Sequence, residues 1–414
     1  MNRFTRYAII AISVLIIGWV GFGKVLGRSA NDNTYKSLIV YSEVLQKIQQ
    51  DYVDEPDMHL VTAGSLHGLL ESLDSESSYL TPREYTEFKQ KSSSSASGET
   101  GLNLSKRFGY IIVTSVLPDT SAEKAGLHSG DILESIAGFT TREMAVGQAK
   151  NLLAGPQGTG VKVGVIRRGK TDPEEVEVVR EKLSTPRLIA QHVDNETLAL
   201  RFPTLDTGRA DEVRARLLDA QKQGVNRVIL DLRECGRGPV SEAIAIARLF
   251  VPSGQLVALR GQTFPTQVFS ADASKVIWKG PVSILMDGTT TGAAEVLAAS
   301  LANTKRGDLV GDRTFGLASE QRLIPLDDGA ALFLTVANYY NADGKSILEE
   351  GVTPTEVVRA SATAADDSDD GDEDVTPTPG TPKDSTIGPR PLSSEDPVLR
   401  KALELLKSPV KKAA

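Results

Sequence analysis

The most apolar stretch of the chain lies at its beginning, where residues 7–23 carry no charge and follow Arg3 and Arg6. A membrane-spanning helix needs about 20 apolar residues, whereas the core of a signal peptide has about 7–15. The pattern therefore predicts a membrane anchor or signal segment in residues 1–30, and it favours an uncleaved span over residues 7–26 rather than cleavage after Gly27. Because positive residues before a span stay inside, we expect a single-pass protein of the cytoplasmic membrane, with its body in the periplasm or another extracytoplasmic space.

Helical periodicity dominates residues 31–93. Between residues 37 and 52, apolar side chains recur at helix spacing, at Leu38, Val40, Tyr41, Val44, Leu45 and Ile48. A second helix is expected over about residues 60–73, and a third from Pro82, after a threonine N-cap. The serine-rich residues 92–97 favour a loop and a domain boundary.

Short strands replace the helices over residues 95–183. Apolar and β-branched runs predict strands at residues 110–116, 131–136, 161–166 and 175–179, with a helix at 146–153. This pattern predicts a small β-domain.

Residues 184–360 alternate between apolar strands and amphipathic helices. Strands are expected at 198–202, 228–232 and 282–286, and helices follow them at 209–223, 240–250 and 292–301. Such alternation predicts a sheet covered by helices. The whole chain is therefore expected to be a multidomain α+β protein with an N-terminal helical segment, a β-domain and an α/β core.

A low-complexity segment, residues 361–392, separates this core from a last predicted helix at 393–407. The segment is rich in Asp, Ser, Thr and Pro, and seven acidic residues fall between Asp366 and Asp374. We expect a disordered, self-repelling linker, a solvated spacer rather than a binding site for a basic partner or a cation. The run supplies much of the net charge of −8, which argues against nucleic acid as a partner.

The composition gives little reason to expect a disulfide, a reactive cysteine or a metal site. Cys235 is the single cysteine, so an intramolecular disulfide is excluded, and without a neighbouring base it is expected to be inert. The four histidines are scattered along the chain, at His59, His67, His128 and His192. Because no histidine or cysteine cluster forms a ligand set, we expect neither a metal nor another cofactor.

The β-domain carries a recognisable pattern. Ser121-Ala-Glu-Lys-Ala-Gly-Leu127, followed by Gly130-Asp-Ile-Leu133, closely resembles a PDZ domain. This resemblance implies that a glycine-containing loop binds the terminal carboxylate of a peptide, which adds as a strand. The matching residues are Gly101, Leu102, Asn103 and Leu104. The expected partners are C-terminal tails of exported or unfolded proteins, and the alternative is a structural β-domain without a ligand.

The α/β region resembles the carboxyl-terminal processing, or tail-specific, serine proteases. The resemblance rests on Leu230-Asp-Leu-Arg233 with Gly236 and Gly238, on Gly311-Asp-Arg-Thr-Phe-Gly316 with Gln321, and on Gly351-Val-Thr-Pro354. Members of that family use a serine nucleophile activated by a lysine, with a glutamine that orients the lysine. The resemblance also implies that the loop with Gly236 and Gly238 donates backbone N–H groups to an oxyanion.

Both catalytic positions differ from the family pattern. The family's serine lies three residues before a glutamate, and in this chain the residue three before Glu295 is Gly292. The lysine is expected about 25 residues later, where Leu317 stands, four residues before Gln321. Glycine has no side chain to attack a carbonyl, and leucine cannot accept a proton.

Three functions follow from these patterns, and whether the chain is an enzyme stays open. The favoured interpretation is a non-catalytic, extracytoplasmic binder of peptide tails that regulates an active protease relative. The alternative is a serine-type endopeptidase with a displaced nucleophile at Thr291, and the third is a purely structural membrane-tethered module. The sequence leaves a homo-oligomer open as well.

Overall fold

The computed structural model describes residues 32–93, 97–107, 109–142, 144–167, 169–358, 392 and 395–407. The expected anchor in residues 1–30 and nearly all of the expected linker at 361–392 lie outside the described residues. No helix in the described ranges is long and apolar enough to cross a membrane. The chain divides into two compact units, residues 1–66 and 67–414.

The N-terminal helices are α2 (Asp32–Asp51) and α3 (Met58–Glu71), and α3 crosses the boundary between the two units. In the first unit, the Tyr41 hydroxyl lies 2.5 Å from Oγ of Ser65 and joins the two helices. The Asp57 carboxylate accepts hydrogen bonds from the N–H groups of His59 and Leu60 and so caps the start of α3.

The second unit continues with β1 (Ser78–Leu80) and α4 (Pro82–Ser93). As predicted, α4 begins at Pro82. Oγ1 of Thr81 accepts from the N–H of Glu84, and the Glu84 carboxylate accepts from the N–H of Thr81, which is a reciprocal capping box.

The small β-domain is an antiparallel sheet with a helix across its apolar face. Its strands are β3 (Leu102–Arg107), β4 (Tyr110–Val116), β5 (Ile132–Ile136), β8 (Gly160–Ile166) and β9 (Glu174–Val179), in that order across the sheet. The short strand β6 (Phe139–Thr140) pairs with β5, while β2 (Ser97–Gly98) pairs with β7 (Gly155–Pro156). The helices are α5 (Ser121–Lys124) and α6 (Val146–Leu153). Val146, Ala149 and Leu153 of α6 pack into the core of this domain, and β3 is an edge strand of its sheet.

The α/β core is a second sheet covered on both faces. Its strands are β10 (Ile189–Asp194), β11 (Thr197–Arg201), β12 (Arg227–Asp231), β15 (Val282–Met286), β16 (Asp308–Gly311) and β19 (Glu356–Val357), in that order. From β11 to β19 the neighbouring strands are parallel. The helices are α7 (Arg209–Lys222), α8 (Val240–Arg248), α9 (Ala293–Asn303) and α10 (Pro397–Lys407).

Alternate residues of the central strands face the two layers. Val228 and Leu230 pack with α7, α8 and α9, whereas Ile229 packs with α10 on the other face. Strands buried on both faces explain the continuous apolar runs in the sequence.

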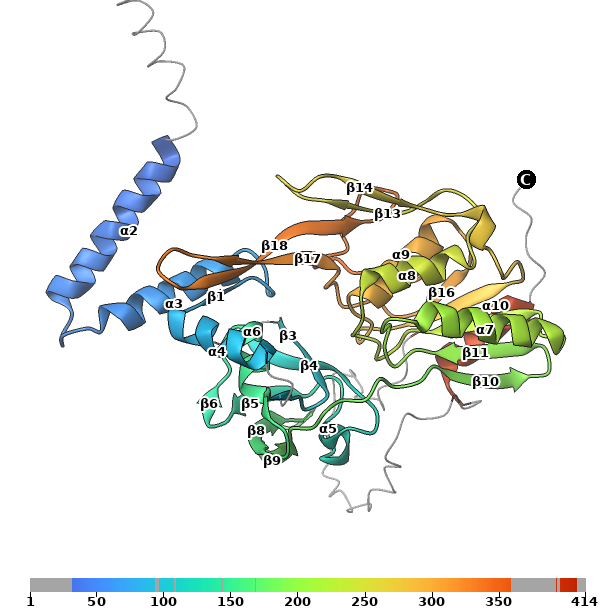
Figure 1. Cartoon of the computed structure of the whole chain (residues 1–414), viewed down its shortest axis with the longest axis horizontal. Coiled ribbons are helices and arrows are strands. Elements are labelled where there is room, and N and C mark those ends of the chain that lie inside the picture. Colours follow the sequence, from blue (N-terminus) through green and yellow to red (C-terminus); the bar gives the residue numbers. More distant parts are fainter. Residues whose placement is uncertain are drawn as a thin grey trace, which may run out of the picture. The chain divides into compact units, whose positions relative to one another are not determined.

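An antiparallel sheet adjoins this core. Its strands are β13 (Gln255–Arg260), β14 (Gln267–Ser270), β17 (Ser319–Pro325) and β18 (Ala331–Tyr340), and a short 3₁₀ helix, η1 (Ala273–Lys275), follows β14. β17 and β18 form a long hairpin (Figure 1). β18 also pairs with β1, Tyr79 opposite Leu332. The residues just before the β-domain and those near the end of the core therefore share one sheet.

An ion-pair cluster holds α10 against the core. The guanidinium of Arg233 makes two hydrogen bonds to the buried Asp231, each 2.8 Å, and an ion pair of 2.8 Å to Asp396. The same Asp396 accepts from the N–H of Val398 at 2.9 Å and caps α10. Arg233 is the second residue after β12, so the last helix is held to the loop that leaves a central strand.

Candidate active site

The turn at Gly292 joins β15 to α9 and has an unusual backbone. Gly292 has a φ of +57° and a ψ of −117°, a conformation that side-chain-bearing residues rarely adopt. A Cβ atom added at this glycine would meet no atom within 4 Å. The turn therefore points its empty side-chain position into open space, as a strained strand-to-helix turn does when it presents a nucleophile.

A fully buried carboxylate organises this turn. Glu295 lies one turn into α9, is 0% exposed, and accepts four hydrogen bonds. The donors are Oγ1 of Thr314 at 2.5 Å and the backbone N–H groups of Gly316, Leu317 and Gly292 at 2.6, 2.7 and 2.8 Å. Burial raises the pKa of the Glu295 carboxyl, and the hydrogen bonds oppose that rise. Because all four partners donate, the arrangement fits the ionised form.

The same carboxylate brings positions 292 and 317 together. One oxygen, Oε2, lies 2.8 Å from the nitrogen of Gly292 and 2.7 Å from the nitrogen of Leu317, so these two nitrogens are at most 5.5 Å apart. The two positions singled out by their spacing in the sequence are therefore neighbours in space. Neither side chain there can attack a carbonyl or accept a proton.

The glycine loop after β12 lies against the turn. The N–H of Thr291 donates to the carbonyl of Cys235 at 3.0 Å. A Cβ on Gly236 would lie 2.7 Å from Oγ1 of Thr291 and 2.9 Å from Oγ of Ser115, so only glycine fits without displacing a neighbour. Gly238 has a φ of +130°, and a Cβ there would overlap the backbone of Leu205. The loop thus brings its backbone close to the turn, where an oxyanion site requires it.

The fallback nucleophiles are poorly placed. Thr291 is 3% exposed, and among the described residues none forms a hydrogen bond with its hydroxyl. Cys235 is fully buried, which raises the pKa of its thiol to about 12 and keeps it protonated. In the part of the chain that the structure describes, no base is hydrogen-bonded to either side chain.

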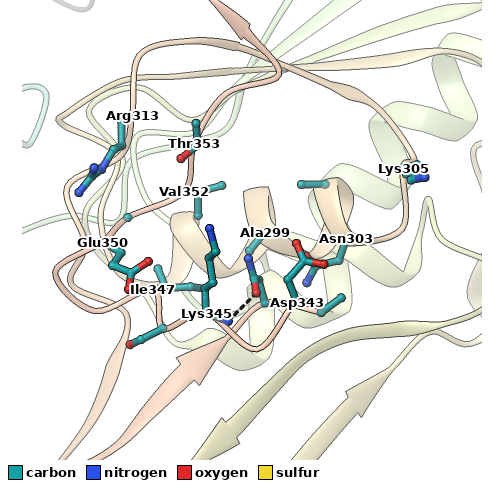
Figure 2. Close-up of a pocket in the computed structure, with 15 residues that line it drawn as sticks. Ala299, Asn303, Lys305, Arg313, Asp343, Lys345, Ile347, Glu350, Val352 and Thr353 are labelled. Atoms are coloured by element: carbon teal, nitrogen blue, oxygen red, sulfur yellow. Dashed lines mark hydrogen bonds between the residues drawn. The ribbon is translucent and has the colours of Figure 1, made fainter.

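The two lysines that flank position 317 in the sequence, Lys305 and Lys345, lie at a different place. Lys305 follows the far end of α9, about 16 Å along the helix axis from the turn. With Lys345, Asp343 and Glu350 it lines an open cavity of about 640 Å³ (Figure 2). Figure 2 shows this cavity beside Ala299 and Asn303, in the second half of α9. It does not include the turn at Gly292.

Gln321 lies on β17, and its side chain binds a different partner from the one expected. Its Nε2 donates to the backbone carbonyl of Glu76 at 2.9 Å. Glu76 belongs to the segment between α3 and β1. The glutamine therefore holds this segment in the structure, rather than a side chain at position 317.

The loop expected to bind a terminal carboxylate begins at Gly101, whose φ is +86°. Among the described residues, none accepts a hydrogen bond from the N–H groups of Thr100 or Gly101. Leu104 is buried in the domain core together with α6. Nδ2 of Asn103 donates to Oγ of Ser115 at 2.7 Å, and this pair lies beside Gly236 of the core. The loop is therefore close to the candidate active site, and two of its backbone donors, on the buried residues Thr100 and Gly101, have no acceptor among the described residues.

Two carboxylates important to this site were not assigned a role from the sequence. In the sequence, Glu295 was used only to locate Gly292. It is, however, the third residue of a helix that follows a glycine, which is the usual place for a side chain that caps the helix start. Glu76 has no comparable local signal. Within the described ranges, no group of three or more His, Cys, Asp or Glu side chains is placed to hold a metal ion.

Comparison with known families gives two matches. Residues 196–358 match the model of peptidase family S41, and residues 90–166 match that of the PDZ domain. The carboxy-terminal-processing protease of Bartonella bacilliformis is 28% identical over 331 residues, which are 79% of this chain and 76% of that protein. The carboxy-terminal processing protease CtpA of Bacillus subtilis is 28% identical over 350 residues, 83% of this chain and 74% of the relative.

A solved structure shares the fold. The photosystem II D1 C-terminal processing protease superposes with a TM-score of 0.64 at 23% identity, over 78% of this chain and 92% of that one. The order of domains and the buried sheet with its helices agree with these matches. The chain therefore carries a PDZ domain ahead of a peptidase family S41 domain, and over most of its length it is similar to carboxyl-terminal processing proteases.

Proposed function

We propose that this chain is a membrane-tethered, extracytoplasmic protein that binds C-terminal tails of other proteins and does not cleave them. The observation that carries the proposal is the Glu295 carboxylate, which holds the backbones of Gly292 and Leu317 within 5.5 Å of each other. The frame for a nucleophile and its base is kept, while both side chains are missing.

The chemistry of acyl transfer explains why this frame alone is inert. A serine hydroxyl attacks a carbonyl only when a base removes its proton, and Gly292 with Leu317 offers neither group. In serine proteases, loss of the nucleophile or of its base lowers kcat roughly 10⁶-fold. The backbone of the loop at Gly236 can still bind an oxygen atom, but no step starts the reaction.

Tail binding is supported by the free backbone donors of the PDZ loop. The N–H groups of Thr100 and Gly101 have no acceptor among the described residues, and β3 is an edge strand next to them. A terminal carboxylate satisfies such donors, and a peptide strand extends the sheet. Binding without cleavage suits a protein that withholds tails from an active relative or delivers tails to it.

The first prediction is the absence of proteolysis. The chain without residues 1–30, incubated with unfolded proteins and tailed peptides, should give no cleavage above the buffer blank, because Gly292 and Leu317 lack the required groups. Peptide products are measured by mass spectrometry. Cleavage that disappears in Thr291→Ala would contradict the proposal and establish the displaced threonine as nucleophile.

A second prediction concerns restoration of the pair. Gly292→Ser combined with Leu317→Lys should give weak peptidase activity, because the two backbones are already adjacent and position 292 opens into free space. Gly292→Ser alone should stay inactive. The partly buried lysine and the left-handed serine should together lower the free energy of unfolding by roughly a few kcal/mol.

The matched control for restoration is Gly292→Ser with Leu317→Met, which keeps a long side chain without a base. Cleavage of a fluorogenic tailed peptide and urea denaturation are measured on each variant. Activity in the methionine control equal to that in the lysine variant would contradict the assignment of position 317 to the base.

A third prediction is that the PDZ domain recognises a free carboxyl terminus. A labelled peptide ending in Ala or Val should bind in the micromolar range, roughly −8 kcal/mol, as expected for one short added strand. The same peptide amidated at its end should bind at least tenfold more weakly, because an amide cannot accept from two N–H groups as a carboxylate does. Equal affinity for the two peptides, measured by fluorescence polarisation, would remove the basis for tail capture.

A fourth prediction concerns location, for which residues 7–26 are the basis. The full chain should stay in the membrane pellet after washing with alkaline carbonate, and the chain without residues 1–30 should not. The body should be digested by a protease added to intact spheroplasts. A mature chain that begins after Gly27 in the soluble fraction would show that the segment is a cleaved signal instead.

A further inference from the structure

The free edge of the PDZ sheet is covered at its centre by the chain itself. Ser105 and Lys106 lie on the edge strand β3, yet they are 0% and 5% exposed. The residues that cover them belong to the segment 71–78, between the end of α3 and the start of β1. Nζ of Lys106 forms an ion pair of 2.7 Å with Glu71, and Oγ of Ser105 donates to Glu76 at 3.1 Å.

This segment also contacts the helix opposite the edge strand. Oε2 of Glu76 lies 3.8 Å from Nζ of Lys150 on α6. A Cβ on Gly147, also on α6, would lie 3.2 Å from Oγ of Ser78. The groove between β3 and α6, in which a tail would lie, therefore ends at a wall made by Glu76 and Ser78.

The wall is fixed before any tail arrives. Oδ1 of Asp74 accepts from the N–H groups of Glu76 and Ser77 at 2.9 and 2.7 Å. Gln321 donates to the carbonyl of Glu76 at 2.9 Å. Three contacts from the backbone of the segment thus set the position of the Glu76 side chain, so a ligand that meets it need not order it first.

A tail meets this wall at a definite depth. When its carboxylate occupies the N–H groups of Thr100 and Gly101, its last residues run antiparallel along residues 102–104 of β3. Because strands pair about one residue to one, the tail reaches Ser105 with about the third or fourth residue before its end. The side chain at that point faces Glu76.

Charge decides which side chain fits there. The Glu76 side chain is only 12% exposed, and among the described residues its one ion pair is the 3.8 Å contact with Lys150, which is itself 54% exposed. Glu71, by comparison, already has a lysine at 2.7 Å. A largely buried carboxylate gains most from a close, hydrogen-bonded cation. Glu76 can exchange its cation, since the half-exposed Lys150 can turn to solvent.

We propose that Glu76 determines the specificity of the PDZ groove by selecting tails with Lys or Arg about the third or fourth residue before the carboxyl terminus. The inference rests on the proposed tail-binding function. Gln321, at the position of the family's orienting glutamine, then serves to hold the residue that selects the ligand.

The test compares three labelled peptides that differ only at the third and fourth residues before the carboxyl terminus. Both of these residues are Lys in one peptide, Gln in the second and Glu in the third. Binding to the full chain in detergent is measured by fluorescence polarisation. The Lys peptide should bind about tenfold more tightly than the Gln peptide, and the Glu peptide should bind most weakly. Glu76→Gln should abolish the preference, so that the Lys and Gln peptides bind to this variant equally.

Two further variants guard against a merely structural effect. Lys150→Gln should enlarge the preference for the Lys peptide, because it removes the competing cation. Glu177→Gln, an exposed acid on β9 of the same domain, should leave it unchanged.

A preference that persists in Glu76→Gln, or equal binding of the Lys and Gln peptides to the unmodified chain, overturns the proposal. The amidated form of the Gln peptide shows whether such a result concerns only Glu76 or the proposed tail binding as a whole. If the free acid binds better than the amide, tail binding stands and only the role of Glu76 falls. If none of the peptides binds, both fall.

Discussion

The Glu295 carboxylate is the interaction on which the candidate active site depends. It is fully buried at the start of α9, and it satisfies donors from the turn at Gly292 and from the loop at Gly316 and Leu317. A buried charge of this kind is tolerable only because its hydrogen bonds are complete. The strand, the turn, the helix and the second loop are therefore joined by one side chain, and each of them is placed relative to the others through it.

That arrangement explains how the scaffold survives without a serine or a lysine. Three of the four donors to Glu295 are backbone N–H groups, which every residue except proline provides. Substitution at position 292 or 317 therefore leaves the network intact. Glycine at 292 even relieves the backbone, because a φ of +57° strains any residue with a side chain. The support of the site is thus independent of the side chains at positions 292 and 317, and it is present here with glycine and leucine at those positions.

The sequence alone was sufficient to predict the strands and helices whose apolar or capping pattern is local. The apolar runs at 198–202, 228–232 and 282–286 became β11, β12 and β15, the alternation of strands and helices predicted the covered sheet, and the threonine before Pro82 marked the start of α4. The spacing between positions 292 and 317 located two residues that are neighbours in space. The roles of Glu76 and Gln321 could not be predicted, because their contact joins side chain and backbone across 245 positions and leaves no periodic trace. The long hairpin of β17 and β18 leaves no clear apolar pattern either, because most of its residues are exposed or half-buried.

The pairing of β1 with β18 has a consequence for how the chain matures. Ser78 lies opposite Phe333, so the β1–β18 pairing joins residues that are separated by most of the sequence. The PDZ domain lies between these two strands along the chain. Such a topology has a high contact order, which slows folding because the entropy of a long loop must be lost before the contact forms. Glu76 is held by the same long-range sheet, because its carbonyl accepts a hydrogen bond from Gln321 on β17. A nascent chain therefore cannot complete the contact between Glu76 and Gln321 until the hairpin of β17 and β18 has been synthesised. A product terminated earlier would have a PDZ domain whose neighbouring segment at Glu76 lacks that support.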